Sequence, residues 1–319
     1  MMSINDYIEK IKSGIMLDKE DALKLAEIDI DKLCKAADEL RKYYCGNQFD
    51  ICTIINGKSG RCSENCKFCA QSSHYETLAE EYPLLETEEV LRDAKYNYDN
   101  GIHRYSVVTS GRKLSDKEVD KISETYKVIK RAINIELCAS HGLLTEEQFK
   151  KLKDAGVSRI HNNLETSRNN FSNVCTTHTF EDKIETIKRA QRAGLSVCSG
   201  GIIGMGETLE DRIDMVLDIR ALGIKSIPVN ILNPIKGTPY EKIKGIDYDE
   251  ICKTIAIFRF LIPDAYIRMA GGRGLLEDKG LRAFKSGANA AISGDMLTTS
   301  GITIKDDMEM LRELNYIIK

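Results

Sequence analysis

One signal recurs along this chain and constrains its fold more than any other feature. A stretch with helical periodicity ends at a glycine, and a short apolar segment follows at once. Glycine just past a helix end supplies the left-handed backbone conformation that closes a helix. Repeated alternation of helices and short apolar strands predicts a parallel sheet. The signal occurs at Gly101, Gly156, Gly194, Gly223 and Gly287.

Eight such apolar segments can be counted, beginning near Cys52, Ile102, Ile133, Val157, Leu195, Ser226, Ala265 and Ala288. Their nearly continuous apolar character is expected of strands that are covered on both faces. Eight strand–helix units predict a (β/α)8 barrel of the TIM type, or a slightly open version of it. We expect one domain over residues 1–319. Residues 1–50 should form a helical extension that packs outside or below the barrel, and residues 51–319 the barrel and C-terminal segment. Two helices carry start signals, because Ser115 with Glu118 and Thr145 with Gln148 are spaced as capping boxes.

Composition and charge restrict the classes of function. The formal net charge is −3 with both signs interspersed, so nothing favours nucleic acid or an anionic membrane as a partner. No apolar run is long enough to span a bilayer, and the N-terminus lacks a secretory pattern, so we expect a cytoplasmic protein. Ten cysteines in a reducing compartment indicate metal binding or redox chemistry rather than disulfides.

Polar and thiol side chains fall at the predicted carboxyl ends of the strands, although the strand bodies are apolar. In a barrel of this type the reactive groups lie at that end. A barrel that needed only a core would not require such residues there. They are Ser106, Cys138, Asn163, Glu165, Cys198, Asn230 and Arg268.

The loop after the first strand carries Cys62, Cys66 and Cys69 at the spacing C-x3-C-x2-C. Soft thiolates select zinc, Cu(I) or iron–sulfur clusters. A structural zinc site needs a fourth ligand, which His74 could supply, but no second cysteine pair follows. Three thiolates suit a 4Fe–4S cluster with one iron that has no protein ligand, and an open metal position can bind a substrate or cofactor.

This loop, with Phe68 just before its last cysteine, resembles that of the radical S-adenosylmethionine enzymes. The resemblance implies that the open iron binds S-adenosyl-L-methionine and that one electron from the cluster yields a 5′-deoxyadenosyl radical. The match is closer to the biotin synthase family, from about residue 40 to near the C-terminus. Its motifs occur here in order as RCSENCKFCAQSSHY, HNNLETS, NVCTTHTFEDK, VCSGGIIGMGET, IPVNILNPIKGTPYE and IRMAGGR.

Membership of that family would imply sulfur insertion into dethiobiotin to form biotin, the last step of biotin biosynthesis, with sulfur supplied by an auxiliary iron–sulfur cluster. It would also imply a reductant such as flavodoxin or ferredoxin, and a homodimer. The alternative is another radical enzyme of the same subgroup, resembling hydrogenase maturases or carbon-skeleton mutases, without a sulfur-donating cluster. A zinc-stabilised module or a plain electron carrier fits the chain length and the polar strand ends poorly.

The resemblance assigns cofactor and substrate contacts residue by residue. It places Phe68, Asn163, Glu165 and Lys183 at the cofactor, and Asn163 and Asn230 at the substrate's ureido ring. Two of these depart from the family, which usually has Asp at the position of Glu165 and Arg at that of Lys183. Without the resemblance, turn or capping chemistry is the alternative for each asparagine.

The auxiliary cluster is where the chain departs most. The family uses three cysteines and one arginine, and Cys138, Cys198 and Arg268 match three of these positions. The remaining cysteine falls on Ser106, whose oxygen is a poor ligand in a sulfur-rich cluster. A 2Fe–2S centre or a variant of different nuclearity is therefore expected. We hypothesise that Cys175 supplies the replacement thiolate, with a small buried side chain as the alternative. Core packing is expected for Cys34, Cys45, Cys52 and Cys252.

Overall fold

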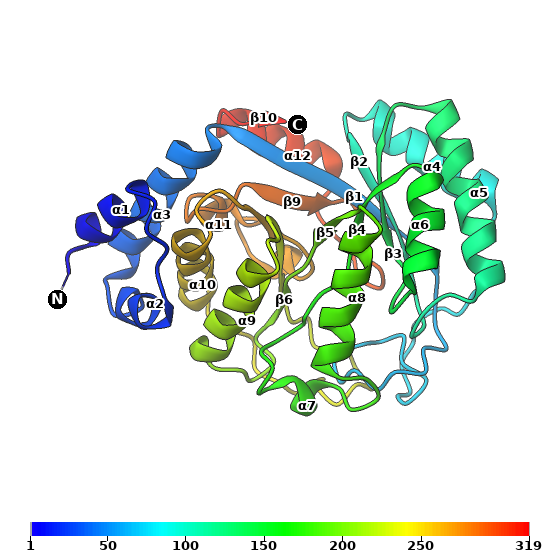
Figure 1. Cartoon of the computed structure of the whole chain (residues 1–319), viewed down its shortest axis with the longest axis horizontal. Coiled ribbons are helices and arrows are strands. Elements are labelled where there is room, and N and C mark those ends of the chain that lie inside the picture. The colour runs from blue at the N-terminus through cyan, green and yellow to red at the C-terminus, as the bar shows by residue number, and fades with distance from the viewer. Residues whose placement is uncertain (1, 319) are drawn as a thin grey trace.

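The computed structural model describes residues 2–318 and contains a closed barrel of parallel strands (Figure 1). The strands pair in the order β1–β2–β3–β4–β5–β7–β8–β9, and β1 also pairs with β9, which closes the barrel. The predicted (β/α)8 barrel is therefore confirmed. Its strands are β1 (Gln48–Lys58), β2 (Arg104–Thr109), β3 (Glu136–Ser140), β4 (Val157–His161), β5 (Ser196–Cys198), β7 (Ser226–Ile231), β8 (Tyr266–Met269) and β9 (Ala290–Ser293).

Helices follow the strands and cover the outside of the barrel. The two predicted capping boxes are present, and all five glycines of the recurring signal have positive φ angles. Local backbone chemistry therefore sets the helix boundaries as the sequence predicts. The helices are α4 (Thr87–Asp99), α5 (Asp116–Ala132), α6 (Glu146–Asp154), α7 (Phe171–Val174), α8 (Phe180–Arg192), α9 (Leu209–Ala221), α10 (Tyr248–Leu261), the 3-10 turn η1 (Arg273–Leu275), α11 (Leu281–Phe284) and α12 (Ile304–Glu313).

The fifth barrel strand is interrupted, because β6 (Gly201–Ile203) continues the direction of β5 after a break and pairs with β7. Gly200 and Gly201 make the break possible. A Cβ atom on Gly200 would clash with the Pro228 carbonyl oxygen, and one on Gly201 with the Glu165 carbonyl oxygen. The glycine pair thus lets the chain lie directly against β7 and against the segment that follows β4.

Three helices precede the barrel: α1 (Ile4–Lys12), α2 (Lys19–Leu25) and α3 (Ile30–Cys45). They form a group beside the barrel (Figure 1), where α3 packs on α10 and α2 packs on α9. The helical extension was expected to reach residue 50, whereas β1 already begins at Gln48. The C-terminal β10 (Ile317–Ile318) pairs with the start of β1.

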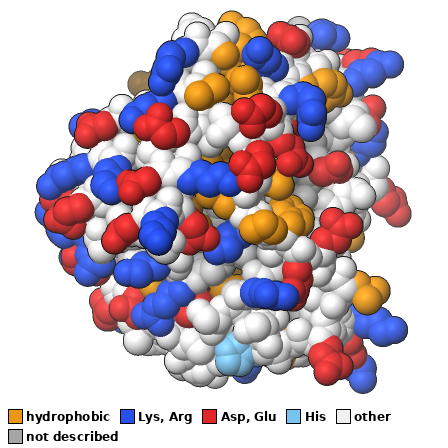
Figure 2. Space-filling model, turned by 90° about the vertical axis from the view of Figure 1, so that its right-hand side faces the viewer, with side chains coloured by type: hydrophobic (Ala, Val, Ile, Leu, Met, Phe, Trp, Pro, Cys, Tyr) orange, Lys and Arg blue, Asp and Glu red, His pale blue; other side chains and the backbone are white. Residues whose placement is uncertain are grey.

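The molecular surface mixes both signs of charge. Figure 2 shows lysine and arginine side chains interspersed with aspartate and glutamate over one face. Within residues 2–318, no helix combines the length and the apolar character needed to cross a membrane.

Candidate active site

The barrel contains a cavity of about 360 Å³ that reaches from the strand interiors to the loops after their carboxyl ends. Most of the residues singled out from the sequence line it. Ser106, Cys138, Cys198 and Arg268 project from the strands themselves. Phe68, Asn163, Glu165 and Asn230 line the part closer to the loops.

Asn163, Glu165 and Asn230 are held in place by the interrupted strand. The Asn163 side chain accepts a hydrogen bond from the Gly200 N–H at 3.1 Å and donates one to Glu165 Oε2 at 3.3 Å. Asn230 donates to the Gly201 carbonyl and accepts from the Gly271 N–H, both at 3.0 Å. Each amide is thus fixed by backbone groups on a neighbouring strand or loop.

Glu165 has a φ angle of 71°, in the left-handed region that non-glycine residues rarely adopt. Its backbone N–H donates to the Gly200 carbonyl, and its own carbonyl accepts from the Ile202 N–H. Such a conformation costs roughly 1–3 kcal/mol and persists only where the surrounding structure enforces it. Here the paired backbone of the interrupted strand enforces it and directs the carboxylate to the cavity.

Three arginines surround one buried carboxylate at the bottom of the barrel. Asp50 lies 3.1 Å from Arg268, 3.3 Å from Arg159 and 3.6 Å from Arg104. Burial raises the pKa of the Asp50 carboxyl, but the charges of Arg268, Arg104 and Arg159 outweigh it and lower the pKa to about 2. Asp50 is therefore ionised at neutral pH, and it balances only one of three positive charges.

The thiols of Cys138 and Cys198 lie beside these arginines. Burial raises the pKa of Cys198, but a hydrogen bond with His161 and the charges of His161, Arg268 and Arg159 outweigh it and lower the pKa to about 6. Burial also raises the pKa of Cys138, which Arg104 and Arg159 oppose. The surroundings of Cys198 therefore favour the thiolate form that binds metal, whereas burial outweighs the two arginines at Cys138 and keeps its pKa raised.

Cys52 also lines this cavity, from β1. Arg268 donates from Nη1 to the Cys52 sulfur at 3.2 Å. The expectation of core packing for Cys52 was therefore wrong, because its side chain points to the barrel axis and not to the layer between strands and helices. Cys252, by contrast, lies on α10, and Cys34 and Cys45 lie on α3, outside the barrel interior.

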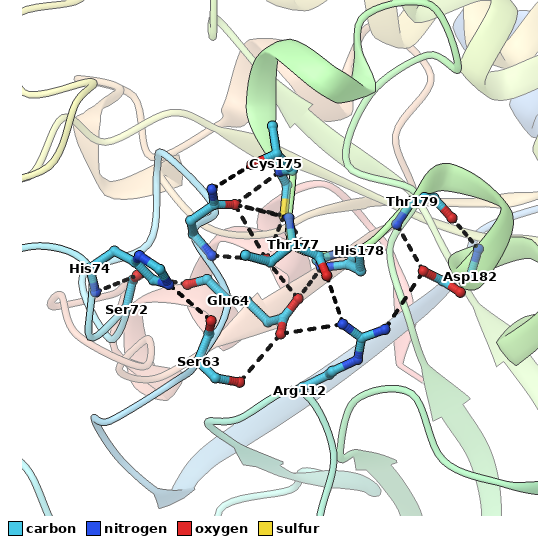
Figure 3. Close-up of polar contacts among 12 residues, drawn as sticks. Ser63, Glu64, Ser72, His74, Arg112, Cys175, Thr177, His178, Thr179 and Asp182 are labelled. Carbon is cyan, nitrogen blue, oxygen red and sulfur yellow. Dashed lines mark hydrogen bonds and ion pairs between the residues drawn. The ribbon is translucent and has the colours of Figure 1, made fainter.

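The loop that carries Cys62, Cys66 and Cys69 is clamped to the segment after α7. Glu64 accepts hydrogen bonds from the Thr177 hydroxyl at 2.8 Å and from His178 Nδ1 at 2.5 Å (Figure 3). Asn65, next in the loop, bonds to the backbone and side chains of Thr176 and Thr177. Figure 3 also shows Arg112 reaching toward Glu64 and Asp182 from the opposite side.

Sequence reasoning missed this clamp. The residues between the first two cysteines carried no signal by themselves, and a lone histidine is weak evidence for a site. A useful signal would have been the pairing of Glu64 and Asn65 with the polar run Thr176–Thr177–His178, which becomes visible only when the two loops are adjacent. His74 does not join the cysteines, since its ring Nε2 contacts the Ser63 carbonyl at 3.0 Å.

Cys175 lies beside Cys66 and does not reach Cys138 and Cys198. Its sulfur contacts Asn65, Thr177 and His178 at 3.3–3.4 Å, and it does not line the cavity. The hydrogen bond with Cys66 lowers the pKa of Cys175 to about 3, although burial opposes this, and His178 adds to the lowering. The hypothesis that Cys175 replaces the missing auxiliary ligand is therefore not supported, because a ligand must reach the same metal ions as the other ligands.

Lys183, on α8, does not line the cavity. The hydrogen bond with Cys175 and burial raise the pKa of Cys66, and the charge of Lys183 opposes that rise. Lys183 is therefore close enough to Cys66 for its charge to act on that thiol, and its place at the cofactor stays a prediction.

The donor sets of this structure fit iron–sulfur clusters. Three thiols on one loop provide the ligands of a cluster with an open iron. Cys62, Cys66 and Cys69 do not themselves line the cavity, but Phe68 of the same loop does. Cys66, Cys175 and His178 have ligand atoms within 4.8 Å of one another and would suit a single ion, but that grouping uses only one of the three loop cysteines.

A parallel eight-stranded barrel with a three-cysteine loop after its first strand defines the class of radical S-adenosylmethionine enzymes. The pattern described as the Radical SAM superfamily matches residues 56–219, and that of the Biotin and Thiamin Synthesis associated domain matches residues 228–317. Within this class the chain belongs to the biotin synthase family, as its relatives show. It is 58% identical over 316 residues to a biotin synthase of Clostridium botulinum (strain Alaska E43 / Type E3), covering 99% of each chain. It is 55% identical over 318 residues to that of Brachyspira hyodysenteriae, covering 100% of this chain and 96% of the relative.

Solved structures of lower identity share the fold. A methylornithine synthase aligns with a TM-score of 0.85 at 20% identity, covering 99% of this chain and 97% of the other. A maturase of the FeFe-hydrogenase aligns with a TM-score of 0.84 at 20% identity, covering 99% of this chain and 75% of the other. At this identity the likeness concerns the barrel alone.

Weakening the loop clamp should loosen the cluster that the loop holds. We expect Glu64→Gln to lose iron to a ferrous chelator roughly 10 to 100 times faster than the parent protein, because groups that orient metal ligands contribute about that factor to metal affinity. The measurement is the rate of iron transfer under anaerobic conditions. Glu81→Gln is the matched control, since Glu81 pairs with Arg61 near the same loop but both side chains are exposed. Equal rates for Glu64→Gln and the control would refute a role for the clamp.

Proposed function

We propose that this chain converts dethiobiotin to biotin by radical-mediated sulfur insertion. The observation that carries the proposal is one cavity that the three-cysteine loop borders through Phe68 and that a deeper group of thiols, able to hold a sulfur source, also lines. The names of its relatives at 53–58% identity support the substrate. Radical chemistry is needed because acid–base groups cannot activate an unactivated C–H bond.

Cys62, Cys66 and Cys69 would hold the 4Fe–4S cluster, which supplies the electron that cleaves S-adenosyl-L-methionine. The residues of the chain then orient the cofactor. The Glu165 carboxylate can accept two hydrogen bonds from a ribose diol, and Asn163 fixes that carboxylate from 3.3 Å away. Lys183 offers a positive charge for the carboxylate of the cofactor, although as a point charge it lacks the two-pronged geometry of arginine. Phe68 adds apolar surface at the cavity wall.

Asn163 and Asn230 are proposed to hold the ureido ring of the substrate, because an amide can both donate and accept hydrogen bonds. Both are anchored by backbone contacts, so little entropy remains to be lost when substrate binds. Cys138, Cys198 and Arg268 would hold the auxiliary cluster deeper in the cavity, which supplies sulfur to the substrate. The enclosing barrel keeps water from reactive radicals.

Three further parts of the proposal concern the electron donor, the oligomeric state and the cellular compartment. We propose that a low-potential protein such as flavodoxin or ferredoxin delivers the electron, that the chain works as a homodimer, and that it functions in the cytoplasm as one barrel domain. Free thiols throughout the chain support a reducing compartment.

The test is turnover by the anaerobically reconstituted protein with S-adenosyl-L-methionine, dethiobiotin and dithionite. Mass spectrometry should detect both 5′-deoxyadenosine and biotin. Cofactor cleavage without biotin, together with iron for only one cluster per chain, would instead support an activity like that of the maturases or mutases that share the barrel.

A further inference from the structure

Three thiols and one guanidinium form a ring inside the barrel. They belong to Cys52 on β1, Cys138 on β3, Cys198 on β5 and Arg268 on β8, and all four line the cavity. These are the first, third, fifth and seventh strands in the order in which the barrel closes. An interior layer of a (β/α)8 barrel receives its four side chains from alternate strands. We call these four residues the thiol layer.

The strand register places Cys52 in this layer. Cys138 is level with Ser106 on β2, and Ser106 is level with Ile54 on β1. Cys52 precedes Ile54 by two residues, so the step from Cys52 to Cys138 advances by two residues along the strands.

The other three steps around the barrel also advance by two residues each. Together the four steps give the shear of about eight that a (β/α)8 barrel requires, so the four side chains meet the axis at one height. Followed across the intervening strand, the pairing brings Cys138 level with Ser196, Cys198 level with Tyr266, and Arg268 level with Asp50. In each case the next residue of the thiol layer lies two positions further along that strand.

Ser106 does not belong to the thiol layer. It lies on β2, the second strand in closing order, and so contributes to a different layer of the interior. Its hydroxyl is a weak ligand for iron in a sulfur-rich cluster. Ser106, at the position where the family has cysteine, is thus next to the thiol layer. Cys52, by contrast, places its thiol within the layer.

Each sulfur atom of the thiol layer accepts a hydrogen bond from a neighbouring side chain. Arg268 donates to Cys52 at 3.2 Å, the Ser226 hydroxyl to Cys198 at 3.2 Å, and Arg104 to Cys138 at 3.9 Å. Donors that point at sulfur are the supporting contacts expected around thiolate ligands of a metal centre.

The charges around the thiol layer also suit a metal centre held by thiolates. Arg268, Arg104 and Arg159 all face the carboxylate of Asp50. The charges of Arg104 and Arg159 also act on the exposed Glu136. Arg159 Nε is buried without a hydrogen-bond partner. Buried charges are costly unless they are paired, so the positive charge at the cavity favours further anionic groups close by. Three thiolates on a metal cluster would supply them.

We propose that Cys52 is the third thiolate ligand of the auxiliary iron–sulfur cluster, with Cys138 and Cys198, in place of the position that Ser106 occupies. This rests on the proposed function, because it assumes that the thiol layer holds that cluster. The three thiolate ligands would then come from one layer, which also contains Arg268.

The test uses a parent protein in which Cys62, Cys66 and Cys69 are all replaced by alanine, so that only the auxiliary cluster can form. After anaerobic reconstitution and desalting, iron, sulfide and visible absorption are measured per chain. Cys52→Ala in this background is expected to lose most of its iron, sulfide and absorption. Cys52→Ser keeps the side-chain size and should lose iron or shift the absorption bands. Circular dichroism of the metal-free proteins verifies that the variants fold.

Two matched controls should retain the cluster of the parent. Ser106→Ala removes the hydroxyl at the family's usual ligand position, and Cys252→Ala removes a buried thiol outside the barrel interior. Loss of iron in Ser106→Ala with retention in both Cys52 variants would overturn the inference.

The outcomes also separate the inference from the proposed function. If Cys138→Ala and Cys198→Ala lose iron while both Cys52 variants keep it, then Cys52 is not a ligand but the auxiliary cluster stands. If the parent binds no iron, or if Cys138→Ala and Cys198→Ala retain it, then the auxiliary cluster itself is refuted.

Discussion

Cys69→Ala is expected to abolish both cleavage of S-adenosyl-L-methionine and formation of biotin. Cys69 is one of only three thiols on the loop after β1, and a cluster with one open iron cannot spare another protein ligand. The loop backbone depends less on this side chain, because the clamp through Glu64 and Asn65 does not involve it. The measurement is 5′-deoxyadenosine released under dithionite, with and without dethiobiotin.

Cys252→Ala serves as the control for Cys69→Ala, since it also removes a thiol but lies on α10 and should cleave the cofactor at the parent rate. Appreciable 5′-deoxyadenosine from Cys69→Ala would contradict the assignment of the loop as the seat of the radical-generating cluster.

Cys138→Ala should separate the two halves of the reaction. The substitution lies on β3, away from the three-cysteine loop, so the cofactor should still be cleaved. Biotin formation should fall by at least about a hundredfold. Loss of a residue that only supports a metal ligand costs up to about that factor, and loss of a ligand itself should cost no less. The ratio of biotin to 5′-deoxyadenosine in one anaerobic assay measures this effect directly. An unchanged ratio would show that the thiol layer does not supply sulfur.

The architecture was predictable because its signals are local. Glycines with positive φ, capping boxes and short apolar strands depend on neighbouring residues, and they give the alternation of the barrel. The three-cysteine loop was predictable for the same reason, since its ligands lie within one short segment.

Cys52 could not be placed in the same way. The strand was expected to begin near this residue, whereas β1 begins at Gln48, and the direction of a side chain in a strand reverses with a shift of one residue. Which residues share a layer depends on the register of all eight strand pairs, and this register is known only once the barrel is closed. The position of Cys175 was hidden for a similar reason, because the motif showed that it follows the fourth strand but not that its sulfur contacts Asn65 and His178.

The segment after β4 joins two separate tasks in one stretch of chain. Its beginning presents Asn163 and Glu165 to the cavity, and its end, at Thr177 and His178, grips the three-cysteine loop. The spacing between the three-cysteine loop and the proposed cofactor contacts is therefore set within a single connected segment, not by the packing of independent elements. Cofactor affinity and cluster retention should accordingly vary together among natural variants of this segment, as one inherited property.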